Sequence, residues 1–154
     1  MPTPSEQLAT LDLTLPPVPA PVAAYLPAVR SGNLVFTAGQ LPFVDGALPV
    51  TGKVGTAVTA DEANKLARIA ALNAVAVVAA EAGGIDNIAR IVKVNVYVAS
   101  DPDFITHSAV ANGASDLLVE IFGDAGKHAR STLGMAVLPM DSPVEVEIVA
   151  ELSD

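Results

Sequence analysis

The chain contains no cysteine among its 154 residues. Disulfide bonds, thiolate nucleophiles and zinc sites with cysteine ligands are therefore excluded. Tryptophan is also absent and aromatic residues make up only 4% of the chain, which disfavours a groove that stacks nucleotide bases. The two histidines, His107 and His128, lack the spacing of a metal site. We interpret both as solvated or core residues.

Positive charge is scarce, with 8 Lys and Arg against 17 Asp and Glu. The net charge of −9 repels phosphate backbones and acidic membranes, so neither nucleic acid nor membrane is an expected partner. Residues 1–15 contain no Lys or Arg, unlike a secretory signal. The longest apolar helical run, 69–80, is shorter than a membrane span. We expect a cytoplasmic protein.

Small apolar residues dominate what is present. Hydrophobic residues make up 51% of the chain, and the excess is alanine and valine, which suit close packing or a buried oligomer interface. The length predicts one domain. Six of the twelve prolines fall within residues 1–24. We interpret 1–24 as an arm that lies on a single domain, 25–154, with an extended stretch at 16–21 and a short helix capped by Ser5.

The hydrophobic pattern predicts the element order ββ-α-β-α-ββ. A hairpin over 28–37 precedes a helix that starts at a Thr59–Glu62 capping box and ends at Ala82 before two glycines. A strand over 91–98 should place Val92, Val94, Val96 and Val98 on the core face. A second helix should open at Asp101 and falter near Asn112 and Gly113. This predicts an α+β fold with two helices on one face of a mixed, mostly antiparallel sheet.

The C-terminal part reads as a strand around Arg130, a tight turn and a return strand over 144–148. Glu145 and Glu147 are two residues apart, so they share one face of that strand. Arg130 could pair with an exposed acidic neighbour, or its planar fork could anchor a ligand carboxylate. The glutamates could be solvated edge charges, or one of them could position a water molecule near Arg130. Asn112 could contact a ligand or mark a helix irregularity.

Several of these motifs together resemble the YjgF/Rid (reactive intermediate deaminase) family over residues 22–152. Arg130 within Ala-Arg-Ser stands nine residues before Pro139 in Leu-Pro, and Val-Glu-Val-Glu-Ile follows. The other matching segments are Tyr25, the Gly-Asn-Leu-Val-Phe-Thr-Ala-Gly-Gln run at 32–40, the capped alanine-rich helix, and the strand at 92–98 followed by Asp103 and Phe104. The proline-bearing arm and extra residues near 107–111 are similar to a branch often described as chorismate-mutase-like or endoribonuclease L-PSP-like.

The resemblance implies a chorismate-mutase-like subunit of bacillary type that assembles into a trimeric barrel with ligand sites between subunits. It implies cofactor-free hydrolysis of 2-imino or enamine acids to 2-keto acids and ammonia. Arg130 would bind the substrate carboxylate, and Glu145 would hold or polarise the attacking water. The expected substrate-binding residues are Tyr25 from an adjacent subunit, Gly39, Asn112 and Thr132.

Two positions depart from the family pattern. Ala38 stands where the family usually has serine, and Thr132 stands where deaminase members often have cysteine. The loss of a hydroxyl at position 38 leaves a second hypothesis open, a non-catalytic trimer that binds or senses a small carboxylate. An endoribonuclease or translation-inhibitor role conflicts with the net charge of −9, and a chorismate mutase activity would rest on fold alone.

Overall fold

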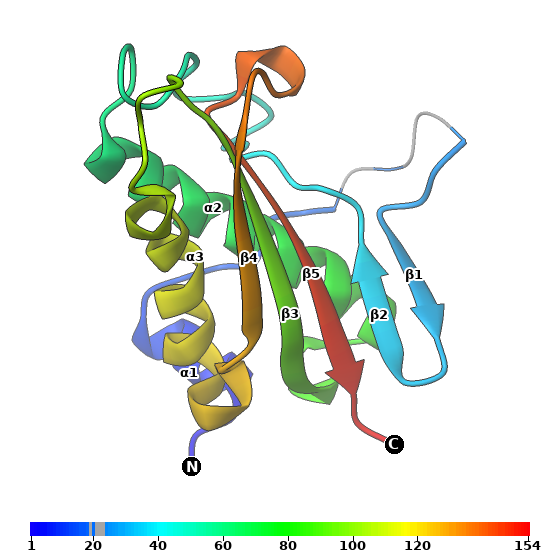
Figure 1. Ribbon diagram of the computed structural model, residues 1–154. Helices are drawn as coiled ribbons and strands as arrows, with labels where there is room; N and C mark the ends of the chain where they lie inside the picture. Colours follow the sequence, from blue (N-terminus) through cyan, green and yellow to red (C-terminus); the bar gives the residue numbers. More distant parts are fainter. Residues whose placement is uncertain (19, 21–23) are drawn as a thin grey trace.

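The computed structural model describes residues 1–18, 20 and 24–154, and within them one five-stranded sheet carries helices on one face (Figure 1). The strand order is β1-β2-β5-β3-β4, and only the β3–β4 pair is parallel. The strands are β1 (Ala28–Ser31), β2 (Leu34–Thr37), β3 (Ile88–Ala99), β4 (Ala129–Met135) and β5 (Val144–Leu152). The helices are α1 (Pro4–Thr10), α2 (Ala60–Ala82) and α3 (His107–Phe122). The predicted α+β class and order are confirmed.

Helix α2 forms as its end signals predict. Thr59 and Glu62 make the capping box, and Gly83 ends the helix at φ 78°, a conformation that glycine adopts without Cβ strain. At 23 residues the helix is long and apolar enough to cross a membrane. The expectation that the longest apolar helical segment is shorter than a membrane span was therefore wrong. However, 61% of its most apolar window is buried inside the domain, as in the core helix of a folded domain.

Helix α3 differs from the prediction at both points. It begins at His107, while Asp101 lies in a turn where its carboxylate accepts a hydrogen bond from the Asp103 backbone. It also continues without interruption through Gly113. That glycine serves close packing, because a Cβ at Gly113 would lie 1.9 Å from the Asn64 carbonyl oxygen of α2. The two helices therefore contact each other through their backbones.

Strand β3 contains a register shift that alternation alone could not reveal. Its pairing with β5 shifts between Ile91 and Lys93. A bulge of this kind inserts one extra residue, so the residues before it face the opposite side from the one that simple alternation predicts. Ile91 is fully buried, whereas Val92 is only partly buried and faces away from the helices. The prediction that Val92 shares the core face was wrong, while Val94, Val96 and Val98 are buried as expected.

Strands β4 and β5 do not form the predicted hairpin, because β3 lies between them and pairs with both. Along β5 the even-numbered residues are buried against the helices and the odd-numbered ones are partly exposed. We call the helix-free side of the sheet the outer face. The pairing of Tyr97 with Glu145 places both on it, whereas Arg130 pairs with buried Val94 and so faces the helix side. Arg130 and Glu145 thus leave the sheet on opposite sides.

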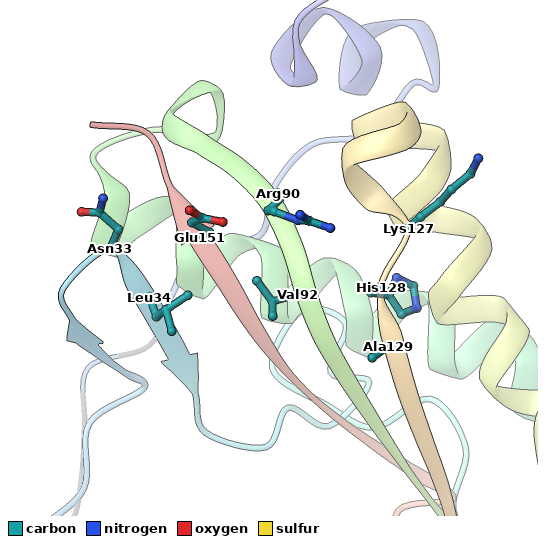
Figure 2. Close-up of a pocket in the computed structure, with 8 residues that line it drawn as sticks. All are labelled: Asn33, Leu34, Arg90, Val92, Lys127, His128, Ala129 and Glu151. Carbon is teal, nitrogen blue, oxygen red and sulfur yellow. The ribbon is translucent and has the colours of Figure 1, made fainter.

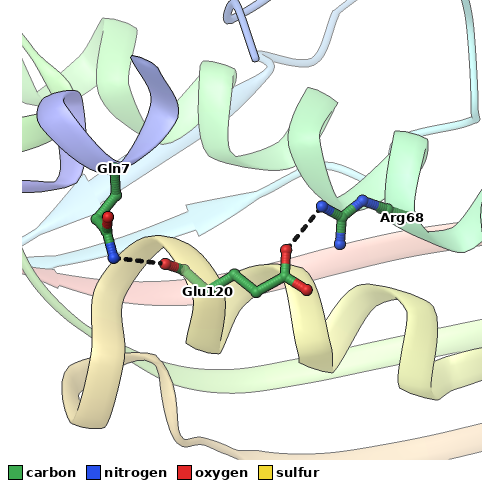
Figure 3. Close-up of polar contacts among 3 residues, drawn as sticks. All are labelled: Gln7, Arg68 and Glu120. Carbon is green, nitrogen blue, oxygen red and sulfur yellow. Dashed lines mark hydrogen bonds and ion pairs between the residues drawn. The ribbon is translucent and has the colours of Figure 1, made fainter. Parts of the chain in front are cut away.

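The N-terminal helix α1 packs on the main body of the domain. Thr3, and not Ser5, caps it. Ser5 instead donates two hydrogen bonds to Asp86, from its backbone at 2.9 Å and its hydroxyl at 2.6 Å. Figure 3 shows Gln7 of α1 donating to the Glu120 carbonyl of α3, while the Glu120 carboxylate pairs with Arg68 of α2 at 2.7 Å. The predicted extended stretch 16–21 lies partly outside the described residues.

Candidate functional site

Arg130 is held from one side by helix α3. Its Nη1 atom donates to Asn112 Oδ1 at 2.8 Å and to Ser115 Oγ at 3.1 Å. Both protons of Nη1 are thereby used, since a terminal guanidinium nitrogen carries two. Among the described residues, Nη2 and Nε have no protein acceptor. That unused edge presents two parallel N–H groups, which is the geometry that a carboxylate binds.

Strand β4 is one of the two edge strands of the sheet and Arg130 is only partly buried, so this arginine is reachable from outside. Thr132 follows Arg130 by two residues and therefore lies on the same side of the strand, partly buried. We call Arg130, Asn112 and Thr132 the arginine half-site. The structure brings together these three of the six residues that the sequence predicted.

Glu145 is placed with a different pair of predicted residues. It packs against Gly39 so closely that a Cβ there would lie 1.9 Å from Glu145 Oε1. The Ala38 backbone N–H next to Gly39 donates to the Pro27 carbonyl at 2.8 Å, which puts exposed Tyr25 at the same end of the sheet. We call Glu145, Gly39 and Tyr25 the glutamate half-site.

The two half-sites do not meet within one chain. Arg130 and Glu145 pair with β3 residues that are three positions apart, on opposite sides of that strand. Their Cα atoms are therefore about 10 Å apart along the strands and about 10 Å apart across them. In addition, their side chains leave opposite faces of the sheet. One chain therefore cannot bring both half-sites to the same small ligand.

A polar network on the outer face separates Glu145 from Glu147. Tyr97 and Asn95 of β3 both donate to Glu147 Oε1, and the Asn95 bond is 3.0 Å long. The Glu147 hydrogen bond, together with burial, raises the pKa of Tyr97 to about 12. Glu147 is thus committed to its neighbours on β3. Glu145 has no such donor among the described residues, so of the two carboxylates it is the one available to bind a water molecule or a ligand.

Burial, and then the neighbouring charge of Glu147, raises the pKa of Glu145 above its usual value of 4.5. A raised folded-state pKa means that folding favours the protonated form, so ionised Glu145 costs stability above both pKa values and nothing below both. We expect Glu145→Gln to be more stable than wild type at neutral pH, with the gain vanishing as pH falls through the region of 4.5.

Urea unfolding of both proteins at several pH values measures this difference. The exposed carboxylate of Glu81 on α2 supplies the matched control, Glu81→Gln. An advantage of the Glu145 variant that persists unchanged at acidic pH would mean that its charge is not the cause.

Two residues at the arginine half-site were not recognised in the sequence. Ser115 Oγ lies 2.9 Å from His128 Nε2, and His128 Nδ1 lies 2.6 Å from the Gly126 carbonyl oxygen. Ser115 follows Asn112 by three residues, so both lie on one face of a helix. That spacing was a usable signal, but the predicted break at Gly113 concealed it.

One hollow in the structure includes none of the residues that define the two half-sites, but His128, which hydrogen-bonds to Ser115 beside Arg130, is part of its lining. This hollow, drawn in Figure 2, lies on the outer face. It is lined by Asn33, Leu34, Arg90, Val92, Lys127, His128, Ala129 and Glu151. Residues 1–18, 20 and 24–154 contain no group of three or more His, Cys, Asp or Glu side chains placed to hold a metal ion.

Comparison with known proteins gives consistent similarities. Residues 5–152 match a family described as YjgF/chorismate mutase-like with a proposed endoribonuclease activity. Protein TCP17 of Trypanosoma cruzi is 41% identical over 96% of this chain and 92% of its own. A 2-iminobutanoate/2-iminopropanoate deaminase of Dermatophagoides farinae is 33% identical over 89% of this chain and 92% of its own. A crystal structure from Shewanella oneidensis, of a protein proposed to be an endoribonuclease, superposes with a TM-score of 0.94 at 35% identity, over 98% of this chain and all of that one.

Proposed function

Because the chain belongs to the YjgF/chorismate mutase-like family, we propose that it hydrolyses reactive 2-imino acids, or their enamine tautomers, to 2-oxo acids and ammonia. The observation that carries this proposal is the free edge of the Arg130 guanidinium, whose other edge is fixed by Asn112 and Ser115. The relative from Dermatophagoides farinae named for the same reaction supports it.

Arg130 binds the substrate carboxylate in this scheme. A guanidinium fork and a carboxylate form two parallel charge-assisted hydrogen bonds, which fix both position and orientation. Orientation is the main requirement, because imines already react with water and a well-placed reactant gains a large rate advantage. Thr132 and Gly39 offer backbone groups beside the ligand, and Tyr25 lines the ligand site.

Glu145 supplies the acid–base step. Its carboxylate accepts a proton from a water molecule as that water attacks the imine carbon, and it passes this proton to the imine nitrogen to give a neutral carbinolamine. A proton then moves from the carbinolamine hydroxyl to the amino group, and ammonia leaves as the C–N bond breaks. The sum is one imino acid and one water giving one 2-oxo acid and one ammonia. A carboxyl with a raised pKa suits this role, since proton transfer is efficient when the pKa lies nearer the working pH.

The site is completed between copies of the chain, and we propose a trimer. The outer face exposes large apolar side chains at Val29 (53%), Phe36 (45%) and Leu133 (45%), which favours its burial in an assembly. In the proposed trimer the β4 edge of one copy packs head-to-tail against the outer face of the next, and a rotation of one third of a turn between copies closes the ring. Each contact then joins one arginine half-site to one glutamate half-site.

Ammonia release from imino acids generated in situ tests the activity, and analytical ultracentrifugation tests the assembly. We expect 2-iminobutanoate and 2-iminopropanoate to be hydrolysed faster than in buffer alone by a species of three chain masses. Ultracentrifugation that finds only monomers would contradict the shared site. No rate increase, combined with thermal stabilisation by 2-oxobutanoate, would instead favour the non-catalytic carboxylate-binding alternative that Ala38 suggests.

Gly39→Ala should displace the Glu145 carboxylate, because the added Cβ would lie 1.9 Å from Oε1. A side-chain end can move, so the fold should tolerate the change while the water-activating group is misplaced. We expect kcat for imine hydrolysis to fall roughly tenfold to hundredfold, within the range of general acid–base contributions, with KM changing little. Steady-state kinetics with a melting curve measures both effects.

Gly46→Ala is the matched control, since a Cβ at Gly46 has no neighbour within 4 Å. Its positive φ of 81° makes alanine strained there, so the variant should lose some stability but keep kcat unchanged. A Gly39→Ala protein with full kcat would remove Glu145 from the mechanism.

A further inference from the structure

We propose that Ser115 and His128 are positioning residues that fix the Arg130 guanidinium for carboxylate binding. This inference rests on the proposed function and deepens it. It starts from a line of four hydrogen-bonded groups that runs from Arg130 through Ser115 and His128 to the Gly126 carbonyl. Neither His128 nor Ser115 reaches the free edge of the guanidinium, so both act through Arg130.

The direction of every hydrogen bond in this line follows from what each group can do. A backbone carbonyl only accepts, so His128 Nδ1, 2.6 Å from the Gly126 oxygen, must carry a proton. In the neutral ring, Nε2 is then an acceptor. Ser115 donates its hydroxyl proton to Nε2 at 2.9 Å, and its remaining lone pairs face Arg130 Nη1 at 3.1 Å. The histidine therefore sets the orientation of the Ser115 hydroxyl group, whose oxygen accepts a hydrogen bond from Arg130.

The far end of the line is fixed by backbone packing. A Cβ at Gly126 would lie 2.2 Å from the Leu118 carbonyl oxygen of α3, so the short 3-10 helix Gly123–Gly126 that precedes β4 contacts α3 directly. The helix that carries Asn112 and Ser115 thus also fixes the carbonyl that orients His128. Two acceptors from one rigid helix, each with a defined direction, prevent the guanidinium from rotating. Preorganisation of this kind strengthens binding because less side-chain freedom is lost on binding.

Four variants test this line. Ser115→Ala removes the acceptor, and Ser108→Ala, an exposed serine on the same helix, is its control. His128→Gln can keep an acceptor near the Nε2 position, whereas His128→Asn reaches only the Nδ1 position. We expect Ser115→Ala to raise KM for 2-iminobutanoate about tenfold, the scale for a hydrogen bond to a charged group, with kcat within about threefold. His128→Asn should follow it, while His128→Gln and Ser108→Ala should stay near wild type.

A double-variant cycle separates positioning from general structure. Binding of 2-oxobutanoate, followed by calorimetry, should weaken about tenfold in Ser115→Ala but be no weaker in Ser115→Ala with Arg130→Ala than in Arg130→Ala alone. The same loss in both backgrounds would overturn the proposal, as would equal KM values for His128→Gln and His128→Asn.

A readout that needs no substrate distinguishes failure of this inference from failure of the proposed function. The chain has four arginines, Arg30, Arg68, Arg90 and Arg130, so nitrogen-15 spectra of labelled arginine can be assigned with single variants. Slow rotation of the Arg130 guanidinium in wild type, lost in Ser115→Ala and kept in Ser108→Ala, supports the positioning role even if no ammonia is released. Fast rotation in wild type overturns it even if the protein is an active deaminase.

Discussion

Replacing Arg130 with alanine is expected to lower kcat/KM for imine hydrolysis by several hundredfold or more. The change removes a bidentate, charge-assisted contact to the substrate carboxylate, and such contacts contribute roughly 3–4 kcal/mol when both hydrogen bonds are lost. The loss should fall on both substrate binding and orientation, because the same contact holds the substrate while water attacks. Ammonia release measured over a range of imino acid concentrations gives kcat and KM separately.

Two further arginine variants show whether the loss is specific. Arg130→Lys keeps the charge but not the planar fork, so it should retain only part of the activity. Arg90→Ala removes a cation that lines the hollow on the outer face and should leave kcat/KM within a few fold of wild type. Full activity of Arg130→Ala would refute the carboxylate-anchor role. A large loss of activity in Arg90→Ala would indicate that the substrate binds in the hollow on the outer face.

Replacing Gly113 with alanine is expected to destabilise the fold, although alanine is normally the better residue inside a helix. Helix propensity alone would favour the change by about 1 kcal/mol. The new Cβ would, however, lie 1.9 Å from the Asn64 carbonyl oxygen, and backbone cannot move aside as a side-chain end can. We expect a net loss of roughly 2–4 kcal/mol and a melting temperature lower by roughly 5–15 °C.

Thermal unfolding followed by circular dichroism measures this effect. Asp116→Ala, an exposed position on the same helix, should stay within about 0.5 kcal/mol of wild type. A melting temperature of Gly113→Ala at or above that of wild type would mean that α2 and α3 can separate at little cost. Since α3 also carries Asn112 and Ser115, a surviving Gly113→Ala protein should bind 2-oxobutanoate less tightly.

Local signals were reliable at both ends of α2 and in the β1–β2 hairpin. The Thr59–Glu62 capping box and Gly83 act within one helix turn, so both ends of α2 were predictable from the sequence. The hairpin of β1 and β2 follows from a two-residue turn between short apolar runs. By contrast, the local sequence around Gly113 is typical of a helix break, whereas the actual role of this glycine depends on the Asn64 carbonyl, 49 positions earlier in the chain. The bulge near Val92 was missed for the same reason, since it exists only in the pairing of β3 with β5.

The sequence by itself determined both ends of α2, the alternation of helices and strands along the chain, the candidate residues Arg130 and Glu145, and a charge unsuited to nucleic acid. These follow from periodicity, turn residues and composition, which act over a few neighbouring positions. Only the tertiary structure decided that β3 separates the strands of Arg130 and Glu145 and that the two side chains leave opposite faces. Strand pairing is a long-range choice governed by burial, and it divides the predicted site into two halves within each chain.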